Sequence, residues 1–530
     1  MKNKILLDCT FRDGGYYNKW NFNLKLFSDY LQCMSVCKID IIEIGFRFNS
    51  KKKYLGNFAY TTDRFLENLD LPNNIIYAVM INAKEFYNLE KDIYKIFSLR
   101  KKSKISLVRI AINFDEFRNS KKIIKNLNNL GYDIGLNLMQ AHDKNELEII
   151  QMLKEIKFWN LKIDHLYFAD SLGCMDNNYI KNITATLTNN WPGSVGIHAH
   201  NNKSMALSNT LTSLNSGAAI CDSTILGMGR GAGNAQTEFL LQEIKGPLKS
   251  KQLKLINALI LKFQNLKLKF NWGYNFLYFY AANNKIHPTY IQTFLAEQRY
   301  SEVQILNILS QISSKDLLSY SKSKIEDIFY ENTKTIKTQN NIDIDIKNNK
   351  KAIIVGNGNS VLNNIDKIKK ILLKDDFTSF FLNKNNFIEN NKYADFTVVV
   401  NTIRLMSDLN QYGQKQINLI APVNKFKHLF KINFKNKKIN NYSVCIKPKT
   451  FIAKKNYTII PYNLAINYAL SICKIFKFKE IYFIGIDGYD DIEKNEEICN
   501  SINLFKKFSR NINLFSLTHS RIKNRFIKKT

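Results

Sequence analysis

The sequence predicts an α/β protein with an N-terminal (β/α)₈ barrel of the TIM type, a helical extension and a C-terminal doubly wound α/β domain. Three observations predict this. The chain has 530 residues, more than a single hydrophobic core usually serves. Its first half alternates short apolar runs with amphipathic stretches of helical length, which is typical of parallel βα units. Its last third holds a second series of apolar runs that end in Gly, Asn or Asp.

The first half contains eight strand candidates, and most of the stretches between them have the length and apolar spacing of a helix. Eight successive βα units close a barrel, so we expect a barrel domain over 1–249. The expected strands are 5–10, 39–46, 74–81, 105–112, 133–139, 164–170, 195–200 and 218–225.

The rest of the chain divides into three parts. Residues 250–331 are expected to form a helical accessory region, because four stretches carry an apolar stripe at helical period. Residues 332–350 lose aromatic side chains and periodicity and are the expected linker. Residues 351–530 are expected to form the α/β (Rossmann-like) domain. The helical stretches are 253–263, 289–298, 301–312 and 321–332, and the strand candidates of the last domain are 351–360, 377–383, 394–401, 417–422, 457–463 and 479–491.

The composition limits the class of protein. A formal charge of +32 would suit a phosphate-rich partner, but lysine is interleaved with Asn and Ile along the whole chain instead of forming a patch. We therefore expect no nucleic-acid partner. No apolar run reaches the ~18 residues that span a bilayer, no signal-peptide run follows Met1, and the eight cysteines include no CxxC pair. We expect a cytoplasmic protein with no integral membrane segment.

Two short motifs point to a metal site. In VGIHAH, His198 and His200 occupy alternate positions, so both imidazoles leave one face of a strand near its carboxyl end. In DCTFRDGG, Asp13 follows the first strand and should reach the same end of a barrel. One carboxylate and two imidazoles suit a first-row divalent cation. Core histidines and a surface Arg–Asp turn would explain either motif alone, but they explain both together poorly.

A family resemblance adds to this interpretation. The run LLDCTFRDGG, the carboxylate in IIEIG, the FADSLGCM turn, the HAHNN strand and the GMGRGAGNAQTE loop stand in a characteristic order over about the first 250 residues. In this order and spacing they resemble the superfamily of metal-dependent pyruvate aldolases and hydroxymethylglutaryl-CoA lyase, and most of all 4-hydroxy-2-oxovalerate aldolase. The resemblance implies a lyase that acts through a pyruvate enolate.

The resemblance also implies roles for particular residues. Asp13, His198 and His200 would bind manganese or magnesium (Mn²⁺ or Mg²⁺), and Arg12 would stabilise the enolate oxygen. The remaining polar positions would support the metal or the substrate. Asp8 and Glu43 would orient the ligands and hold Arg12, Asn234 would assist at the metal, and Ser171 would approach the substrate carboxylate.

The general base is left open by the sequence. Related hydroxy-oxovalerate aldolases carry a histidine three residues after the motif aspartate, where this chain has Tyr16. Tyr16 itself, His287, Tyr290 and His142 are the alternatives. The substitution predicts a different acceptor from the small aldehyde of the relatives, and a sugar aldehyde is the interpretation we favour.

The C-terminal half offers a weaker motif. Gly356, Asn357 and Gly358 follow a strand and precede a helix, so their amides could cradle phosphate. The segment resembles bacterial sialyltransferase-like and motility-accessory-type domains, which implies a nucleotide-sugar ligand. The histidine base expected of a sialyltransferase is not evident, and a binding or assembly domain is equally compatible with the sequence.

These features lead to one principal hypothesis and two alternatives. The principal one is a metal-dependent aldolase that joins a small-molecule 2-oxo acid and an aldehyde, or cleaves their product, in surface-glycan biosynthesis. The alternatives are a Claisen-type acyl-CoA acyltransferase on the same barrel, and a glycan-assembly protein whose function lies in the C-terminal domain. A homo-oligomer is expected.

Overall fold

The computed structural model divides the described residues into two compact units. The first lies within residues 1–299 and the second begins at Tyr300, and each is described by itself. The described residues are 4–49, 55–87, 89–296, 300–310, 342–347, 350–401, 404–405, 408, 417–423, 439–489 and 492–529.

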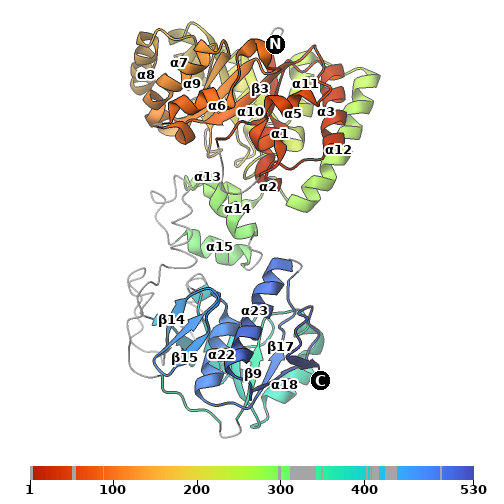
Figure 1. Ribbon diagram of the computed structural model, residues 1–530, viewed down its shortest axis with the longest axis vertical. Helices are drawn as coiled ribbons and strands as arrows, with labels where there is room; N and C mark the ends of the chain where they lie inside the picture. The colour runs from red at the N-terminus through yellow and green to blue at the C-terminus, as the bar shows by residue number, and fades with distance from the viewer. Residues whose placement is uncertain are drawn as a thin grey trace. The chain divides into compact units, whose positions relative to one another are not determined.

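A closed barrel of eight parallel strands forms the first unit (Figure 1). Each strand pairs with the next in sequence, and β1 closes the ring by pairing with β8. The predicted barrel is confirmed, and every one of the eight expected strands contributes to it. The strands are β1 (Ile5–Asp8), β2 (Ile41–Phe46), β3 (Ile76–Asn82), β4 (Leu107–Asn113), β5 (Asp133–Met139), β6 (His165–Asp170), β7 (Ser194–Ala199) and β8 (Ile220–Ser223).

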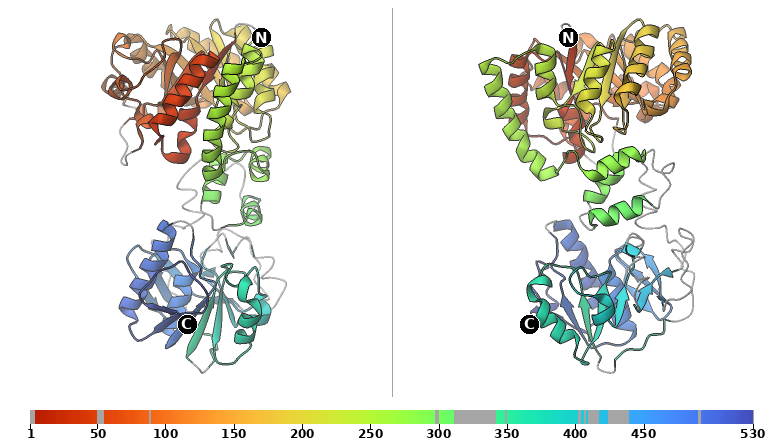
Figure 2. Two further views of the ribbon diagram at one scale, coloured as in Figure 1. Left: turned by 90° about the vertical axis from the view of Figure 1, so that its right-hand side faces the viewer. Right: turned by 180° about the vertical axis from the view of Figure 1, so that it is seen from behind.

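Helices surround this barrel, and local sequence signals set their ends. The helix α3 begins where the Asn23 side chain accepts the N–H groups of the first turn, and α8 begins at a capping box of Asn145 and Glu148. The long helix α12 lies beside α3 (Figure 2). The helices are α1 (Thr10–Asp13), α2 (Gly15–Asn18), α3 (Leu24–Cys37), α4 (Asn57–Tyr60), α5 (Asp63–Glu67), α6 (Ile93–Ile96), α7 (Lys121–Asn129), α8 (Glu146–Phe158), α9 (Asn177–Asn190), α10 (Ala206–Asn215), α11 (Thr237–Lys245), α12 (Ser250–Phe270), α13 (Phe276–Asn283) and α14 (Pro288–Ala296).

The barrel interior is filled in layers, apolar below and charged above. Ile41, Leu107 and Ile220 pack together inside the barrel. Because alternate strand residues share a face, the side chains two positions further along also point inward, at the carboxyl ends of the strands. Those side chains are Glu43, Arg109 and Asp222, all buried.

The second unit is a doubly wound sheet. Its eight strands pair in parallel, with the order β13-β12-β11-β10-β9-β17-β18-β19. Alternate residues of β9 pack on opposite sides, Ile354 toward α22 and α23 and Ile353 toward α18. The strands are β9 (Lys351–Val355), β10 (Thr378–Leu382), β11 (Phe396–Val398), β12 (Leu419–Ala421), β13 (Ile439–Asn441), β17 (Glu480–Ile484), β18 (Asn513–Ser516) and β19 (Ile527–Lys529); the helices are α15 (Glu302–Leu309), α18 (Ile365–Leu372), α19 (Asn390–Tyr393), α22 (Ala465–Ile475) and α23 (Ile492–Phe508).

The predicted parallel sheet is present, with one difference in its membership. The expected strand 457–463 lies in a separate three-stranded sheet, where β16 (Tyr457–Ile460) pairs in parallel with β14 (Ser443–Ile446) and antiparallel with β15 (Ile452–Lys454). An isolated apolar run does not indicate which strand it will join. The expected helix 321–332 and most of the expected linker 332–350 lie outside the described residues.

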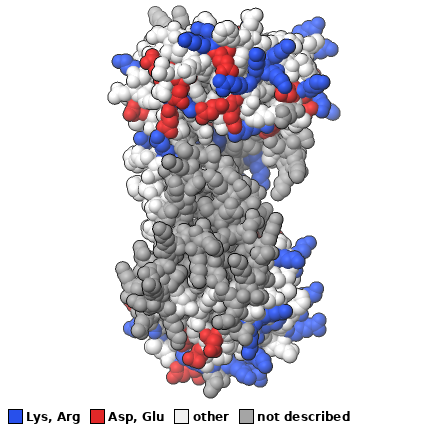
Figure 3. Space-filling view, turned by 90° about the vertical axis from the view of Figure 1, so that its left-hand side faces the viewer, with Lys and Arg blue, Asp and Glu red and all other residues white. Residues whose placement is uncertain are grey.

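Two surface observations complete the fold. On the face of the barrel unit drawn in Figure 3, Lys and Arg side chains are interspersed with Asp and Glu. Within the described residues, no helix has both the length and the apolar character needed to cross a bilayer.

Candidate functional site

Three buried side chains meet at the carboxyl end of the barrel. Asp13 comes from α1 directly after β1, His198 from β7, and His200 from the residue that follows β7. Each offers one ligand atom, and these atoms lie within 4.8 Å of one another. All three residues are almost fully buried. The structure therefore brings together the carboxylate and the two imidazoles that the sequence indicated.

Asp222 fixes the orientation of His198. Its Oδ2 lies 2.9 Å from His198 Nδ1, while His198 Nε2 faces Asp13 Oδ2 at 3.9 Å. A histidine whose Nδ1 is held by a carboxylate presents Nε2 to a metal, an arrangement common among metal-ligating histidines. Arg109 donates to the same Asp222 oxygen at 2.6 Å. Burial tends to raise the pKa of Asp222, but Arg109 and His198 outweigh it, so this pKa lies below its ordinary value.

A chain of buried charges connects the site across the barrel. Arg12 donates to Asp13 at 2.7 Å and to Glu43 at 2.6 Å, and Arg109 donates to the other oxygen of Glu43 at 3.2 Å. With Asp222, this network contains three buried carboxylates and two buried guanidiniums. Buried charge is costly unless it is compensated, so a cation beside Asp13 would stabilise the network.

The electrostatics of Asp13 fit the role of a metal ligand. Burial opposes its charged form, but the adjacent Arg12 guanidinium holds the pKa of Asp13 well below its ordinary value. Burial, with His198 next to it, holds the pKa of His200 well below its ordinary value, so this imidazole is neutral. An ionised carboxylate and a neutral imidazole are forms that bind metals.

The glycine-rich loop after β8 closes over this set. Asn234 donates its side-chain N–H to Asp13 Oδ2 at 2.6 Å. A Cβ added at Gly229 would lie 2.5 Å from Asn234 Nδ2 and 2.7 Å from Asp13 Oδ2, so only glycine permits this approach. The loop backbone is thereby packed directly against the ligand set.

The site keeps buried polar atoms that the described residues do not satisfy. His200 Nδ1, Asn234 Oδ1 and Arg12 Nη2 have no hydrogen-bond partner among them. Buried polar atoms are nearly always paired in native proteins, so several at one place indicate a ligand. Together with the Asp and His donors, they fit a divalent cation and an anionic substrate.

Tyr16 makes contacts unlike those of a base. Its ring packs edge-on against Trp20, with centroids 4.9 Å apart, and the guanidinium of Arg230 lies 4.6 Å from the ring centroid. The side chain is 37% exposed on α2. The Tyr16 ring thus makes a cation–π contact with the Arg230 guanidinium.

His287 lies just before α14 with its Nδ1 accepting the backbone N–H of Thr289 at 3.3 Å. The ring proton of neutral His287 therefore sits on Nε2. Burial, aided by the charge of Arg230, lowers the pKa of His287 to about 3. Burial also lowers the pKa of His142, whose ring lies beside Asp143. Asp143 in turn pairs with Lys285, which lies between α13 and α14.

Two predicted site residues have other partners. The expectation that Asp8 holds Arg12 is corrected: Asp8 accepts hydrogen bonds from Tyr30 of α3 at 2.6 Å and from Thr237 of α11 at 2.5 Å. Because its neighbours Leu7 and Cys9 face the barrel interior, Asp8 points outward to the helices. Ser171 Oγ accepts the backbone N–H of Gln140 at 3.0 Å.

The predicted phosphate cradle is already filled by the protein. Gly356 and Gly358 donate their N–H groups to the carbonyls of Ile484 and Gly485, and the Asn357 side chain bridges to Lys384 and Asn386. The carboxylate of Asp487 accepts the Ser360 N–H at 2.8 Å, where a phosphate would sit. Since a carboxylate repels phosphate, this geometry argues against the nucleotide-sugar expectation.

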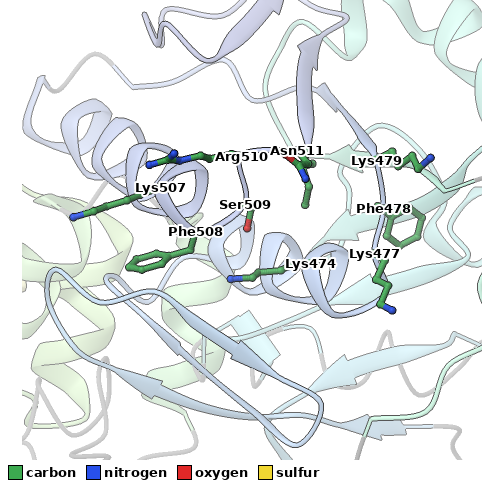
Figure 4. Close-up of a pocket in the computed structure, with 10 residues that line it drawn as sticks. Lys474, Lys477, Phe478, Lys479, Lys507, Phe508, Ser509, Arg510 and Asn511 are labelled. Carbon is green, nitrogen blue, oxygen red and sulfur yellow. The ribbon is translucent and has the colours of Figure 1, made fainter.

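A basic pocket of about 490 Å³ lies elsewhere in the second unit (Figure 4). It is bordered by the C-terminal turns of α22 and α23, at the amino ends of β17 and β18. Lysines at helix C-termini compensate the helix dipole, and Lys506 donates to the carbonyls of Arg510 and Ile512. Five of the lining side chains are Lys474, Lys477, Lys479, Lys507 and Arg510.

Barrel enzymes carry their active sites at the carboxyl ends of the strands, and the Asp–His–His set lies at that end of this closed parallel barrel. Residues 3–261 match the family model described as HMGL-like. The barrel unit is therefore similar to the pyruvate-aldolase and hydroxymethylglutaryl-CoA lyase superfamily, and named relatives support a lyase over about half of the chain.

Three relatives illustrate the similarity. The 4-hydroxy-2-oxovalerate aldolase of Pectobacterium atrosepticum is 25% identical over 248 residues, which are 46% of this chain and 69% of that enzyme. The oxaloacetate decarboxylase of Mycobacterium tuberculosis is 25% identical over 247 residues, 46% of this chain and 70% of that enzyme. The crystallised N-terminal domain of a candidate aldolase from Bacteroides vulgatus aligns with a TM-score of 0.52 and 29% identity, covering 57% of this chain and 99% of that domain.

Three residues of the site were missed by the sequence argument. Arg109 and Asp222 are charged positions within otherwise apolar strands, and such a position is a readable signal of a functional interior. Arg230 lies between glycines in a loop, where no periodicity marks it.

Proposed function

We propose that the barrel unit is a divalent-cation-dependent aldolase that forms or breaks the C3–C4 bond of a 4-hydroxy-2-oxo acid through the enolate of pyruvate. The observation that carries the proposal is the unpartnered Nη2 of Arg12, buried beside Asp13, His198 and His200. An oriented guanidinium next to a cation site is suited to an oxyanion that appears during the reaction.

The substrates in the relatives' names support the same intermediate. A 4-hydroxy-2-oxovalerate and an oxaloacetate share a 2-oxo carboxylate, and cleavage of the C3–C4 bond in either leaves the enolate of pyruvate. A divalent cation held by Asp13, His198 and His200 would act as a Lewis acid toward the 2-oxo group. The difference between the two reactions lies only in what leaves with C4.

The chain's own residues then have separate tasks. Glu43 and Asp13 hold the Arg12 guanidinium in place through Nε and Nη1, which leaves Nη2 directed to the developing enolate oxygen. Burial tends to lower the pKa of Arg12, but the carboxylates of Glu43 and Asp13 raise it well above its ordinary value. The Arg12 guanidinium is therefore always positively charged. Asn234 and Asp222 fix Asp13 and His198. This fixed arrangement stabilises charge without reorganisation during the reaction.

Proton transfer completes the reaction. In condensation, C3 of pyruvate loses a proton, the enolate carbon attacks the aldehyde carbon, and the resulting alkoxide takes up a proton; cleavage reverses these steps. Burial, aided by the charge of Arg230, lowers the pKa of His287 to about 3, so His287 is a weak base.

Exchange of the pyruvate methyl protons tests the proposal without knowledge of the aldehyde. The full chain is incubated with Mn²⁺ and pyruvate in D₂O, and deuterium uptake at C3 is followed by NMR. We expect exchange by the wild type and none above background by His200→Asn. His165→Asn is the matched control, because His165 begins β6 at the opposite end of the barrel, and it should retain exchange. Exchange that persists in His200→Asn contradicts the proposal.

A further inference from the structure

Arg230 differs from the other guanidiniums inside the barrel unit. Arg12, Arg47 and Arg109 are buried, and each pairs with at least one carboxylate. Among the described residues, Arg230 forms no ion pair, and its buried Nε has no hydrogen-bond partner. A partly buried cation without an anion is unfavourable unless a ligand supplies the anion.

The loop holds Arg230 between the ligand set and the connection to α14. Its neighbour Gly229 packs against Asp13 and Asn234, as described above. On the other side, a Cβ added at Gly231 would lie 2.8 Å from Asn202 Oδ1 and 2.9 Å from Pro288 Cβ. Tyr17 donates to the Gly231 carbonyl at 3.3 Å, and Ala232 donates its N–H to Asn202 at 3.0 Å. The backbone at Arg230 is therefore anchored on both sides.

Tyr16 orients the guanidinium from below. The ring is itself fixed by Trp20 and Phe46, which pack against it at centroid distances of 4.9 and 6.0 Å. A guanidinium that lies over a ring face can still donate its N–H groups, in its own plane, to an oxyanion. Arg230 follows Gly229, where an added Cβ would lie 2.7 Å from Asp13 Oδ2, so the backbone at Arg230 lies next to the ligand set.

We infer that Arg230 is a specificity-determining residue that binds an anionic group on the acceptor, so the substrate is an aldehyde carrying a carboxylate or a phosphate. The inference rests on the proposed aldolase function. The 2-oxo acid already has Arg12 and the cation site for its own oxygens, which leaves Arg230 for the second substrate. Tyr16 is then a positioning residue: its ring holds the Arg230 guanidinium, and in this way it contributes to the choice of aldehyde.

Paired aldehydes test this inference. Succinic semialdehyde is compared with butanal, and glyceraldehyde 3-phosphate with glyceraldehyde, in the Mn²⁺-loaded full chain with pyruvate. The wild type should prefer the anionic member of at least one pair, and the preferred pair identifies carboxylate or phosphate. Arg230→Gln should lower kcat/KM for that anionic aldehyde by about 10- to 100-fold, the value of a hydrogen bond to a charged group, and lower that of its neutral partner much less. Arg230→Lys should restore part of the preference.

Tyr16→Phe and Tyr16→Leu separate the ring contact from a catalytic hydroxyl. The phenylalanine variant keeps the ring and should keep the preference, whereas the leucine variant should weaken it. The inference is overturned if Arg230→Gln lowers kcat/KM equally for both aldehydes of a pair. It is also overturned if the main effect of Arg230→Gln is a raised KM for pyruvate in methyl exchange. Methyl exchange by a wild type that shows no preference for an anionic aldehyde overturns this inference alone, while failure of methyl exchange in the wild type overturns the proposed function as well.

Discussion

In both units the carboxyl ends of parallel strands form an edge, but the hydrogen bonds at the two edges differ. Both are built on parallel strands, and both have glycine-containing loops at the carboxyl ends where ligands usually bind. At the barrel edge, His200, Asn234 and Arg12 each keep a buried polar atom without a partner among the described residues. At the edge of the second sheet, Asp487 accepts the hydrogen bonds that a phosphate would have accepted, and Gly356 and Gly358 donate to backbone carbonyls.

This difference shows that a glycine motif after a strand is a weak guide to a ligand. What distinguishes the barrel edge is hydrogen-bonding capacity that the protein itself leaves unused, together with an excess of buried carboxylate. At the second edge, the N–H groups of Gly356 and Gly358 are used for hydrogen bonds within the protein.

The largest effect is expected from removing the oxyanion donor of the barrel edge. Arg12→Ala should slow pyruvate methyl exchange by about 10²- to 10³-fold, the usual loss for one such donor. Arg64→Ala, which alters an arginine in the last turn of α5, is the control. A rate within a few-fold of wild type for Arg12→Ala would contradict the role given to its Nη2.

A smaller effect is expected at the residue behind the ligands. Asp222→Asn removes the carboxylate that orients His198, and such outer partners are typically worth 10- to 100-fold in metal affinity. Titration with Mn²⁺, followed by electron paramagnetic resonance, measures the loss. Unchanged affinity would mean that His198 is oriented by other contacts.

The second edge should respond through stability. A Cβ at Gly358 would lie 2.2 Å from the Asp487 carboxyl carbon. Gly358→Ala should therefore lower the free energy of unfolding of its unit by about 1–3 kcal/mol, the usual cost of overpacking. Urea unfolding of the full chain, with exposed Asn359→Ala as the control, measures this. A stability equal to that of the control would show that the loop is not filled as described.

A pH-dependent effect on stability is expected at the support of the barrel loop. Glu238 is buried in α11 and accepts the Leu226 N–H, and burial raises its pKa from 4.5 to about 7. Between these values the folded chain keeps a proton that the unfolded chain releases, so stability falls as pH rises through this window. Glu238→Gln has no carboxyl group to titrate at this position, so it lacks this pH dependence. Its stability relative to wild type should increase from pH 4.5 to 7, and a constant difference would refute the assignment.

Much of the fold and part of the site followed from the sequence. Period and length predicted all eight barrel strands, and the alternate spacing of His198 and His200 placed both rings at one end. The direction of Asp8 could not be predicted by motif, because it depends on which strand face is interior. Asp487 and Arg230 could not be assigned either, since their partners Ser360 and Tyr16 lie more than one hundred residues away along the chain.

The most direct test of the account is the stoichiometry of Mn²⁺ binding by the full chain and by one variant at each edge. Isothermal titration should give one tight site per wild-type chain. We expect Asp13→Asn to lose this site and Asp487→Asn to retain it, because of these two edges the barrel edge alone leaves ligand atoms unused among the described residues. A tight site that survives in Asp13→Asn, or that disappears in Asp487→Asn, would contradict the central claim.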